Sequence, residues 1–252
     1  MNFDGKIIVV TGAAGGFGEG IARRFAALGG TVALVDLKQE AAAHVAGEIV
    51  AAGGKAQAFH ADVSSGADMA RVAGEIESAL GKLDILVNNA GITHKNSPML
   101  DIDEATFDRV FAINVKSIYL SAVNFVPQMR ARGGGAIVNI ASTAGIRPRP
   151  GLTWYNGSKG AVITLTKSMA AELAPDRIRV NAINPVMGAT GMLAGLLPGE
   201  DTEENRARII ATIPLGRFSQ PRDIANAATF LAADEADLIT GACLEVDGGR
   251  CI

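Results

Sequence analysis

The 252-residue sequence has few of the features that mark secreted or membrane-bound proteins. It contains only two cysteines, Cys243 and Cys251, which we interpret as free thiols of a reducing compartment. No N-terminal stretch joins a basic start to an apolar run, and no run of about eighteen apolar residues is present. We therefore expect a cytoplasmic protein with no secretion signal and no membrane partner.

Charge of one sign and aromatic residues are also scarce. The net charge is −3 with both signs scattered along the chain, which argues against nucleic acid as a partner. The three histidines are widely separated and suggest no metal site. What the chain has in abundance is hydrophobic residues, at 48%, and 30 glycines. This composition predicts a well-buried globular fold with many tight turns.

Hydrophobic segments of two kinds alternate along the chain. Short β-branched runs predict buried strands at residues 6–10, 31–35, 56–60, 83–87, 136–140 and 178–183, with a last strand after Gly241. Longer Ala-rich segments with helical spacing lie between them, at residues 17–28, 40–52, 67–80, 104–130 and 155–173. Such alternation predicts an α/β fold, a doubly wound parallel sheet in three α/β/α layers, formed by residues 1–252 as a single domain.

One irregular region interrupts this pattern after the sixth strand. Residues 185–200 are rich in glycine and precede a polar helical segment at 203–211. Long connections of this kind in compact domains are either functional lids or disordered loops. We expect a substrate lid at about residues 186–212.

A glycine-rich turn follows the first strand and reads Thr11-Gly-Ala-Ala-Gly-Gly-Phe-Gly18. Glycines let the backbone approach a pyrophosphate, and the helix that follows offers free N–H groups. Asp36 ends the second strand, where a carboxylate accepts hydrogen bonds from an adenosine ribose and repels a 2′-phosphate. Lys38 is the one nearby cation, so the sequence favours NAD over NADP. The alternative is that Asp36 only caps a strand end or a helix.

Tyr155 and Lys159 lie four residues apart in a predicted helix and therefore project from one face. A free phenol has a pKa of about 10, which a neighbouring ammonium and an oxidised nicotinamide would lower. Ser142 ends the fifth strand and is placed to hold a substrate oxygen while Tyr155 transfers a proton. Each motif alone is weak, because amphipathic helices acquire Tyr-x-x-x-Lys by chance. Their order after the glycine turn and Asp36 predicts a hydride-transferring oxidoreductase.

On these motifs the sequence resembles the short-chain dehydrogenase/reductase family over essentially its whole length, in the compact single-domain branch with a Rossmann fold. The resemblance implies catalytic roles for Asn114, Ser142, Tyr155 and Lys159. Asn114 would hold a water that links the lysine to solvent, and Lys159 would also grip the nicotinamide ribose. The implied cofactor-binding residues are Gly12, Gly16, Phe17, Gly18, Asp36, Asp62, Val63, Asn89, Ala90, Gly91, Tyr155, Lys159, Pro185 and Thr190.

The resemblance also suggests a pocket wall for the substrate. Its residues by family position are His94, Ala144, Leu152, Trp154, Met187, Met192 and Leu193, most of them apolar. Val186 replaces the glycine that many relatives have after the proline, and we expect it to narrow the nicotinamide side. Arg147 and Arg149 shortly precede Tyr155. They either hold an anionic substrate group or form a surface or subunit contact, and the sequence favours the second.

The function implied by the resemblance is an NAD(H)-dependent oxidoreductase that interconverts a secondary alcohol and a ketone. The substrate would be a small polyol, sugar, hydroxy acid or cyclic alcohol. The alternative is reduction of 3-oxoacyl thioesters on acyl-carrier protein, although most such enzymes prefer NADPH, which Asp36 opposes. Extended-branch epimerases need a longer C-terminal region, and non-catalytic NAD-sensing proteins generally lose Tyr155 or Lys159. Apolar faces on the helices at 104–130 and 155–173 suggest a homotetramer.

Overall fold

The central sheet of the computed structural model, which describes residues 1–252, has seven parallel strands in the order β3-β2-β1-β4-β5-β6-β7. The strands are β1 (Ile7–Thr11), β2 (Thr31–Asp36), β3 (Lys55–His60), β4 (Ile85–Asn88), β5 (Gly135–Ile140), β6 (Ile178–Pro185) and β7 (Cys243–Val246). The strand order reverses between β1 and β4, which creates a topological switch point where such sheets bind ligands. The predicted doubly wound parallel sheet is confirmed.

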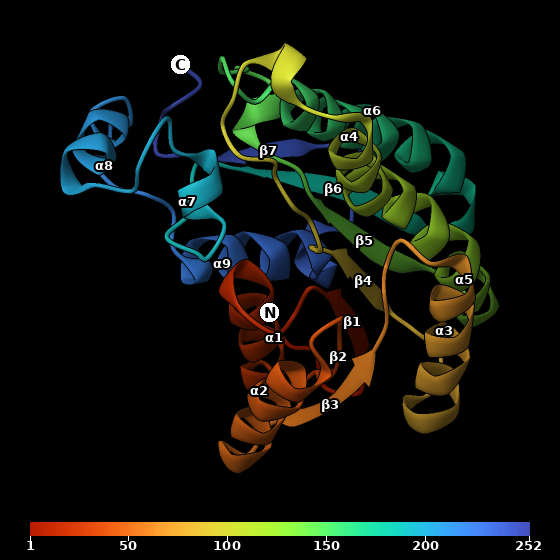
Figure 1. Cartoon of the computed structure of the whole chain (residues 1–252). Helices are drawn as coiled ribbons and strands as arrows, with labels where there is room; N and C mark the ends of the chain where they lie inside the picture. The colour runs from red at the N-terminus through yellow and green to blue at the C-terminus, as the bar shows by residue number, and fades with distance from the viewer.

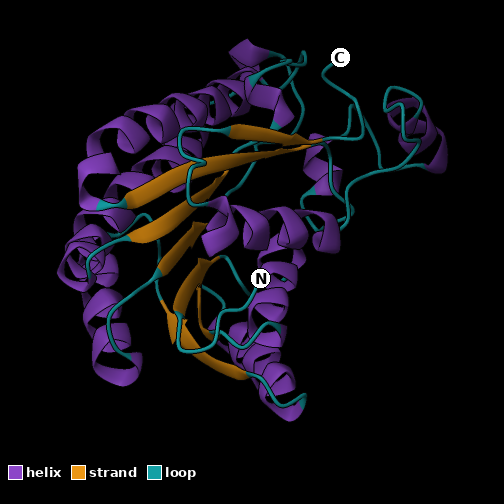
Figure 2. Ribbon diagram, turned by 180° about the vertical axis from the view of Figure 1, so that it is seen from behind, coloured by secondary structure: helices purple, strands orange, loops and turns teal.

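Helices cover both faces of this sheet (Figures 1 and 2). One face carries α1 (Gly16–Ala27), α2 (Gln39–Ala51) and α9 (Pro221–Ala232). The other face carries α3 (Gly66–Leu80), α4 (Glu104–Phe111), α5 (Ser117–Arg132) and α6 (Thr153–Leu173). Two short helices, α7 (Leu193–Leu196) and α8 (Glu203–Ile210), stand away from both layers. They belong to the segment in which the sequence predicts a lid.

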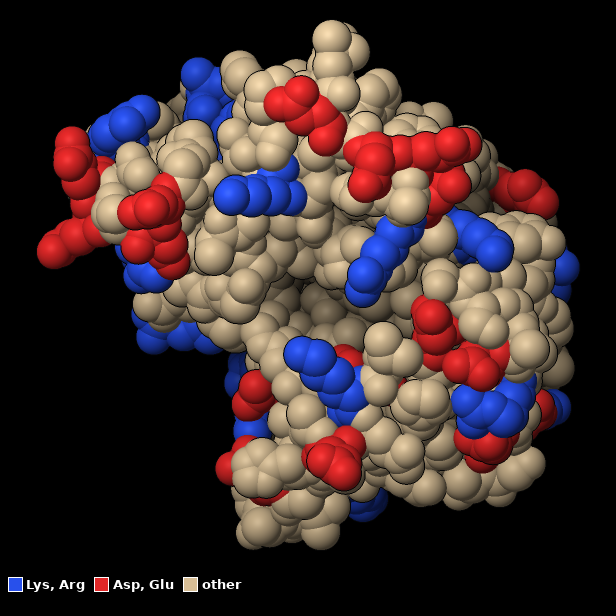
Figure 3. All heavy atoms as spheres, in the orientation of Figure 1, with Lys and Arg blue, Asp and Glu red and all other residues tan.

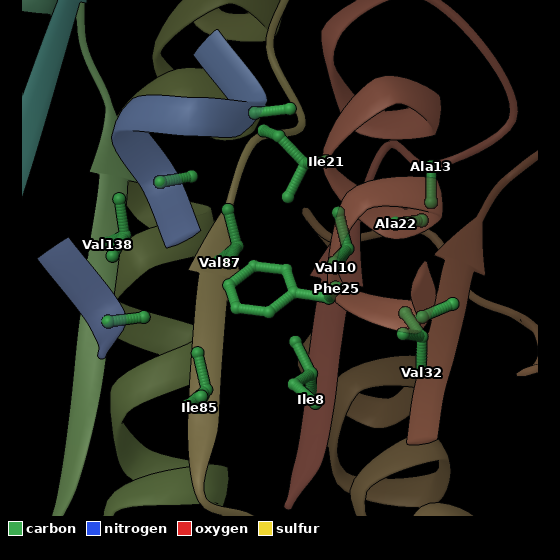
Figure 4. Packing of buried hydrophobic residues seen from close by; sticks show 14 of the residues in the cluster. Ile8, Val10, Ala13, Ile21, Ala22, Phe25, Val32, Ile85, Val87 and Val138 are labelled. Carbon is green, nitrogen blue, oxygen red and sulfur yellow. The ribbon is translucent and has the colours of Figure 1, made fainter. Parts of the chain in front are cut away.

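The core lies on both sides of the sheet, so the strands are apolar on both faces. Ile8 and Val10 of β1 and Val87 of β4 pack against Ile21 and Phe25 of α1, and all five are fully buried (Figure 4). A second cluster joins the opposite face of the strands to α3, α5 and α6. This double burial explains the nearly continuous apolar runs in the sequence. It also gives the loops at the carboxyl end of the sheet a rigid base.

The predicted helix at 104–130 is a helical stretch that ends at Arg132. Its α-helical parts, α4 and α5, are joined by a π-helical turn at Ala112–Lys116. This 29-residue stretch is long and apolar enough to cross a membrane by length and composition alone. However, 44% of its most apolar window is buried inside the domain, and Phe125 and Met129 are fully buried in the core. A core helix passes the same test. Asn114 lies in the π-helical turn.

Candidate active site

A cleft of about 600 Å³ lies at the carboxyl ends of the strands, on both sides of the switch point. Its walls come from the turn after β1, the ends of β2, β4, β5 and β6, and the segment that follows β6. Figure 3 shows this face hollowed at its centre, with Lys and Arg side chains along the border of the hollow. The cleft therefore brings together segments that are far apart in the sequence.

Most of the predicted site residues line this cleft. They are Gly12, Gly16, Phe17, Asp36, Asp62, Val63, Asn89, Ala90, Gly91, Ser142, Tyr155, Lys159, Pro185, Met187, Thr190 and Met192. Gly18 and Asn114 do not reach the cleft surface but pack directly behind it. The predicted pocket residues His94, Ala144, Leu152, Trp154 and Leu193 are also absent from its lining.

The glycine-rich turn has the backbone that close approach to a ligand requires. Gly12 and Gly16 adopt φ values of 63° and 58°, in the left-handed region that favours glycine. A Cβ on Gly18 would overlap the carbonyl oxygen of Gly12, so this position needs glycine for the packing of α1. Gly15 faces open space, with no atom within 4 Å of where its Cβ would be. The turn is thus tightly packed at Gly18, on the side of α1, and open at Gly15, which lines the cleft. Binding of a pyrophosphate requires such an open backbone.

Asn89 holds the glycine turn against β4. Its side-chain amide donates to the carbonyl oxygens of Thr11 and Gly12 at 2.9 and 3.0 Å. In return, the Thr11 hydroxyl accepts the backbone N–H groups of Asn89 and Ala90, both at 3.1 Å. The polar residues at the end of β4 therefore position the backbone of the turn as well as facing the cleft.

Asp36 lies at the same end of the cleft and combines the two roles considered for it. One carboxylate oxygen accepts the N–H of Ala14 in the glycine turn at 2.9 Å, and the other accepts the N–H of Lys38 at 2.9 Å. The side chain is half-buried and lines the cleft. An anionic oxygen here fits the ribose hydroxyls of an adenosine and opposes a 2′-phosphate. The turn, Asp36 and Asp62-Val63 together fit the adenosine half of NAD.

The reacting end of the cleft is built around Tyr155 and Ser142. Tyr155 is on the first turn of α6 and only 4% exposed, and Ser142 follows β5. Burial raises the pKa of the Tyr155 phenol, whereas a hydrogen bond with Ser142 and the nearby charge of Arg149 oppose that rise. Both side chains line the cleft, so a substrate oxygen that contacts both hydroxyls would receive or lose a proton there.

Lys159 lies one turn further along α6 and is 4% exposed. Its ammonium donates to the carbonyl oxygen of Ile140 at 2.8 Å. A Cβ on Gly91 would lie 3.3 Å from both Lys159 Nζ and Asn114 Oδ1, so these two side chains face the same glycine. Asn114 is itself fixed, because its amide donates to the Ile92 carbonyl oxygen at 2.9 Å and its oxygen accepts the Ile92 N–H at 2.8 Å.

Burial of an ammonium group without an acidic partner costs stability. It lowers the pKa of Lys159 from 10.5 to about 8, which corresponds to about 3 kcal/mol whenever the group is protonated in both states. The hydrogen bond to Ile140 is worth about 1 kcal/mol. We therefore expect Lys159→Met to raise the free energy of unfolding of the cofactor-free protein by about 2 kcal/mol at pH 7. Urea denaturation measures this difference.

The increase in the free energy of unfolding caused by Lys159→Met should depend on pH. Between pH 8 and 10.5 the unfolded chain binds the proton and the folded chain does not, so the wild type is stabilised as the pH rises. The advantage of Lys159→Met over the wild type should therefore shrink across this window. Lys167→Met, at an exposed position of the same helix, is the matched control. A Lys159→Met protein that is less stable than the wild type at pH 7 would contradict the argument.

The segment after β6 closes over the glycine turn. A Cβ on Gly16 would lie 3.3 Å from Thr190 Cγ2, and a Cβ on Gly188 would overlap the ring of Phe17. Val186 is 7% exposed and packs in an apolar cluster with Met187 and Tyr155. Val186 also lines the cleft, on the side of Tyr155. These contacts place the predicted lid segment directly beside both ends of the cleft.

Several of the predicted pocket residues contact other parts of the fold and do not line the cleft. The indole of Trp154 donates to the carbonyl oxygen of Met99 at 3.1 Å and packs edge-on against Phe107. His94 is 4% exposed, and its ring bonds to the Lys95 carbonyl oxygen at 2.9 Å. Ala144 and Leu152 are buried with Tyr155 in the apolar cluster behind the cleft.

The cleft also contains residues that the sequence motifs did not identify. These are Arg109 and Ile113 near the π-helical turn, Leu196, Ile209 and Thr212 of the lid segment, and Arg250 after β7. None of them belongs to a short motif, and Arg250 reaches the cleft only because β7 returns to the edge of the sheet beside β6. Strand order is therefore the only signal that could have found it.

Comparison with known proteins agrees with this geometry. A family model described as Enoyl-(Acyl carrier protein) reductase matches residues 12–250. The chain is 50% identical to a 4-formylbenzenesulfonate dehydrogenase of Comamonas testosteroni over 100% of both chains. It is 40% identical to 2-(S)-hydroxypropyl-CoM dehydrogenase 3 of Xanthobacter autotrophicus, over 97% of this chain and 96% of the relative.

A solved structure is also similar to this chain over nearly its whole length. A 3-ketoacyl-(acyl-carrier-protein) reductase from Brucella melitensis, complexed with NADH, is 44% identical with a TM-score of 0.92, and 99% of each chain is covered. The predicted reaction class and cofactor are confirmed: the protein is an NAD-dependent oxidoreductase that acts on CH–OH groups. With the glycine turn, the Asp36 carboxylate and the Ser142-Tyr155-Lys159 constellation in one cleft, the chain belongs to the short-chain dehydrogenase/reductase family.

Proposed function

We propose that this chain interconverts a secondary alcohol and a ketone with NAD(H), and that Ser142, Tyr155 and Lys159 carry the chemistry. One observation supports this assignment above the others. Tyr155 is buried and lines the same cleft as Ser142, with the Lys159 ammonium one turn away and the glycine turn in the same cleft. A small polyol, sugar, hydroxy acid or cyclic alcohol is the proposed substrate.

The proposed division of labour follows the positions of the groups. Bound NAD supplies the hydride acceptor. Ser142 holds the alcohol oxygen, and Tyr155 as phenolate removes the hydroxyl proton as the C–H bond is cleaved. Lys159 stabilises the phenolate and binds the nicotinamide ribose. Asn114, fixed by its two bonds to Ile92, keeps a water beside Lys159 through which the proton leaves.

The surroundings complete the proposal. Residues 186–212 act as the lid, since Thr190 and Gly188 already approach Gly16 and Phe17. A lid that excludes water strengthens the electrostatic effect of Lys159 on Tyr155. We further propose a cytoplasmic homotetramer, supported by the exposed Tyr119 and Val123 on α5, which are 62% and 48% exposed.

A panel of alcohols tests the proposed reaction. We expect NAD-dependent formation of NADH, followed by absorbance, with secondary alcohols of the four proposed classes and little with primary aliphatic alcohols. Ketone reduction by NADH should occur with the matching ketone. No turnover with any secondary alcohol or ketone would contradict the proposal. A monomeric mass at micromolar concentration in sedimentation experiments would contradict the tetramer alone.

A second candidate is the reduction of 3-oxoacyl thioesters. It is favoured by the 44% identity to the Brucella melitensis reductase, whose structure contains NADH, so that Asp36 alone does not decide against it. Acetoacetyl thioester reduction by NADH, measured beside the alcohol panel, separates the two. A thioester rate well above every ketone rate would favour this second function.

A further inference from the structure

Three arginines gather at the end of the cleft that holds Tyr155. Arg147 and Arg149 come from the segment between β5 and α6, and Arg250 follows β7; all three line the cleft. A guanidinium N–H of Arg147 donates to the backbone oxygen of Arg250, which connects the two segments. The proposed proton and hydride transfer uses none of these arginines.

These guanidinium groups have no acidic partner in the chain. None of the three takes part in an ion pair with Asp or Glu. Nη1 of Arg250 is buried and makes no hydrogen bond. Nη1 of Arg149 reaches only the sulfur of Met187 at 3.8 Å, and a thioether is a weak acceptor. Arg149 and Arg250 are half-buried, and cationic donors that are buried without partners are unfavourable, so these two favour an anion from outside the chain.

The cleft is also polarised along its length. Its acidic lining residues, Asp36 and Asp62, lie at the ends of β2 and β3, with Lys38 beside Asp36, whereas the three arginines lie at the reacting end with no acidic residue in the lining beside them. Burial lowers the pKa of Arg149, the Tyr155 phenolate opposes this, and the charge of Arg250 lowers it further. An arginine side chain nevertheless remains protonated at neutral pH. The reacting end therefore carries a surplus of positive charge, which favours an anionic group of the substrate there.

We infer that the substrate carries an oxyanion, a sulfonate or a carboxylate, which Arg149 and Arg250 bind while its hydroxyl-bearing carbon lies beside Tyr155. This inference rests on the proposed function of Ser142 and Tyr155. A planar guanidinium matches an oxyanion with two parallel hydrogen bonds. Met187 and Met192 line the space nearby and provide adaptable apolar contacts for the body of the substrate.

A matched set of substrates tests the inference. The set is one secondary benzylic alcohol with a para-sulfonate, a para-carboxylate or a para-sulfonamide, the last being a neutral group of similar shape. We expect the wild type to prefer at least one anionic alcohol over the sulfonamide by about 100-fold in kcat/KM, since bonds to charged groups are the strong ones. The ratio of sulfonate to carboxylate rates shows which oxyanion the arginines fit.

Substitution of Arg149 isolates the source of this preference. Arg149→Met should reduce the ratio of anionic to neutral kcat/KM by about tenfold or more, with Arg250 keeping the remainder, and Arg149→Lys should restore part of the loss. The ratio cancels any general effect of Arg149 on Tyr155. Arg222→Gln, at an exposed position on α9 outside the cleft, should keep the wild-type ratio. NADH binding, followed by fluorescence, verifies that each variant is folded.

The outcomes separate this inference from the proposed function. Turnover of all three alcohols at equal kcat/KM, or an unchanged ratio in Arg149→Met, would overturn the anion site and leave the alcohol chemistry intact. If none of the three alcohols reacts, calorimetry with benzenesulfonate and benzenesulfonamide decides the anion site, and the separate panel of alcohols decides the proposed function. Binding of benzenesulfonate alone, lost in Arg149→Met, supports the site; equal binding of both compounds, or binding of neither, overturns it.

Discussion

Tyr155→Phe is expected to lower kcat for alcohol oxidation by about 10³-fold, because it removes the one hydroxyl placed to exchange a proton with the substrate. The ring packs in the apolar cluster with Val186 and Met187, and a phenylalanine fills the same space. Folding and KM for the alcohol should therefore change little. Steady-state kinetics at saturating NAD, with the best alcohol of the panel, measures the loss.

The chain offers an unusually clean control for this substitution. It contains only two tyrosines, and the other, Tyr119, is 62% exposed on α5 and outside the cleft. Tyr119→Phe keeps the ring that the proposed subunit contact uses and removes only a hydroxyl outside the cleft, so it should retain wild-type kcat. NADH binding to both variants should match the wild type within about threefold. Full turnover by Tyr155→Phe would mean that another group moves the proton.

Asp36→Asn is expected to change the cofactor preference by about 10²- to 10³-fold. The carboxylate would lose its charge-assisted bonds to the ribose hydroxyls, each worth about 1.5–3 kcal/mol, so NAD should bind more weakly. Removal of the negative charge should at the same time improve NADP, with Lys38 nearby to attract its phosphate. The ratio of kcat/KM for NAD to that for NADP measures both effects.

Asparagine is the informative replacement because Asp36 also braces the glycine turn. It retains one acceptor oxygen for the N–H of Ala14 or Lys38, so the turn should keep its shape. Glu40→Gln, an exposed acid on α2 outside the cleft, controls for a general change in charge. An unchanged NAD-to-NADP ratio in Asp36→Asn would show that the carboxylate serves only the turn.

Local sequence patterns predicted most of the sheet and the cofactor end of the cleft. The β-branched runs are short and apolar, as is typical of parallel strands that are buried on both faces. The glycine turn and Asp36 are contiguous with strand ends, so their positions follow from the topology of a parallel sheet. Helix limits also follow closely, as α6 shows by starting at Thr153, two residues before Tyr155.

Features set by tertiary packing were not predictable in the same way. Helix α9 escaped notice because its short Ala-rich segment follows the irregular lid region, although it packs closely on α1. The π-helical turn at Asn114 was not predicted, since such single turns inside a longer helix are rare and the segment was read as one uninterrupted helix. Trp154 and His94 precede or follow motif residues in the chain, yet their side chains bond to Met99 and Lys95 instead of lining the cleft.

The arginine cluster at the reacting end could not be predicted from sequence either. Arg147 and Arg149 are close in sequence to Tyr155, but sequence alone favoured a surface or subunit contact for them. Their partner in the cleft, Arg250, lies about a hundred residues later and approaches them only through the pairing of β7 with β6. A lack of acidic partners is likewise a property of three-dimensional packing.

Transfer of deuterium from the alcohol to the cofactor is the most direct test of the central claim. A secondary alcohol that the panel shows to react, deuterated at its hydroxyl-bearing carbon, is oxidised by the enzyme with NAD in ordinary water. Direct hydride transfer predicts NADH that carries one deuterium at C4 of its nicotinamide, detected by mass spectrometry and proton NMR. NADH without deuterium, with the label released to water, would contradict the account.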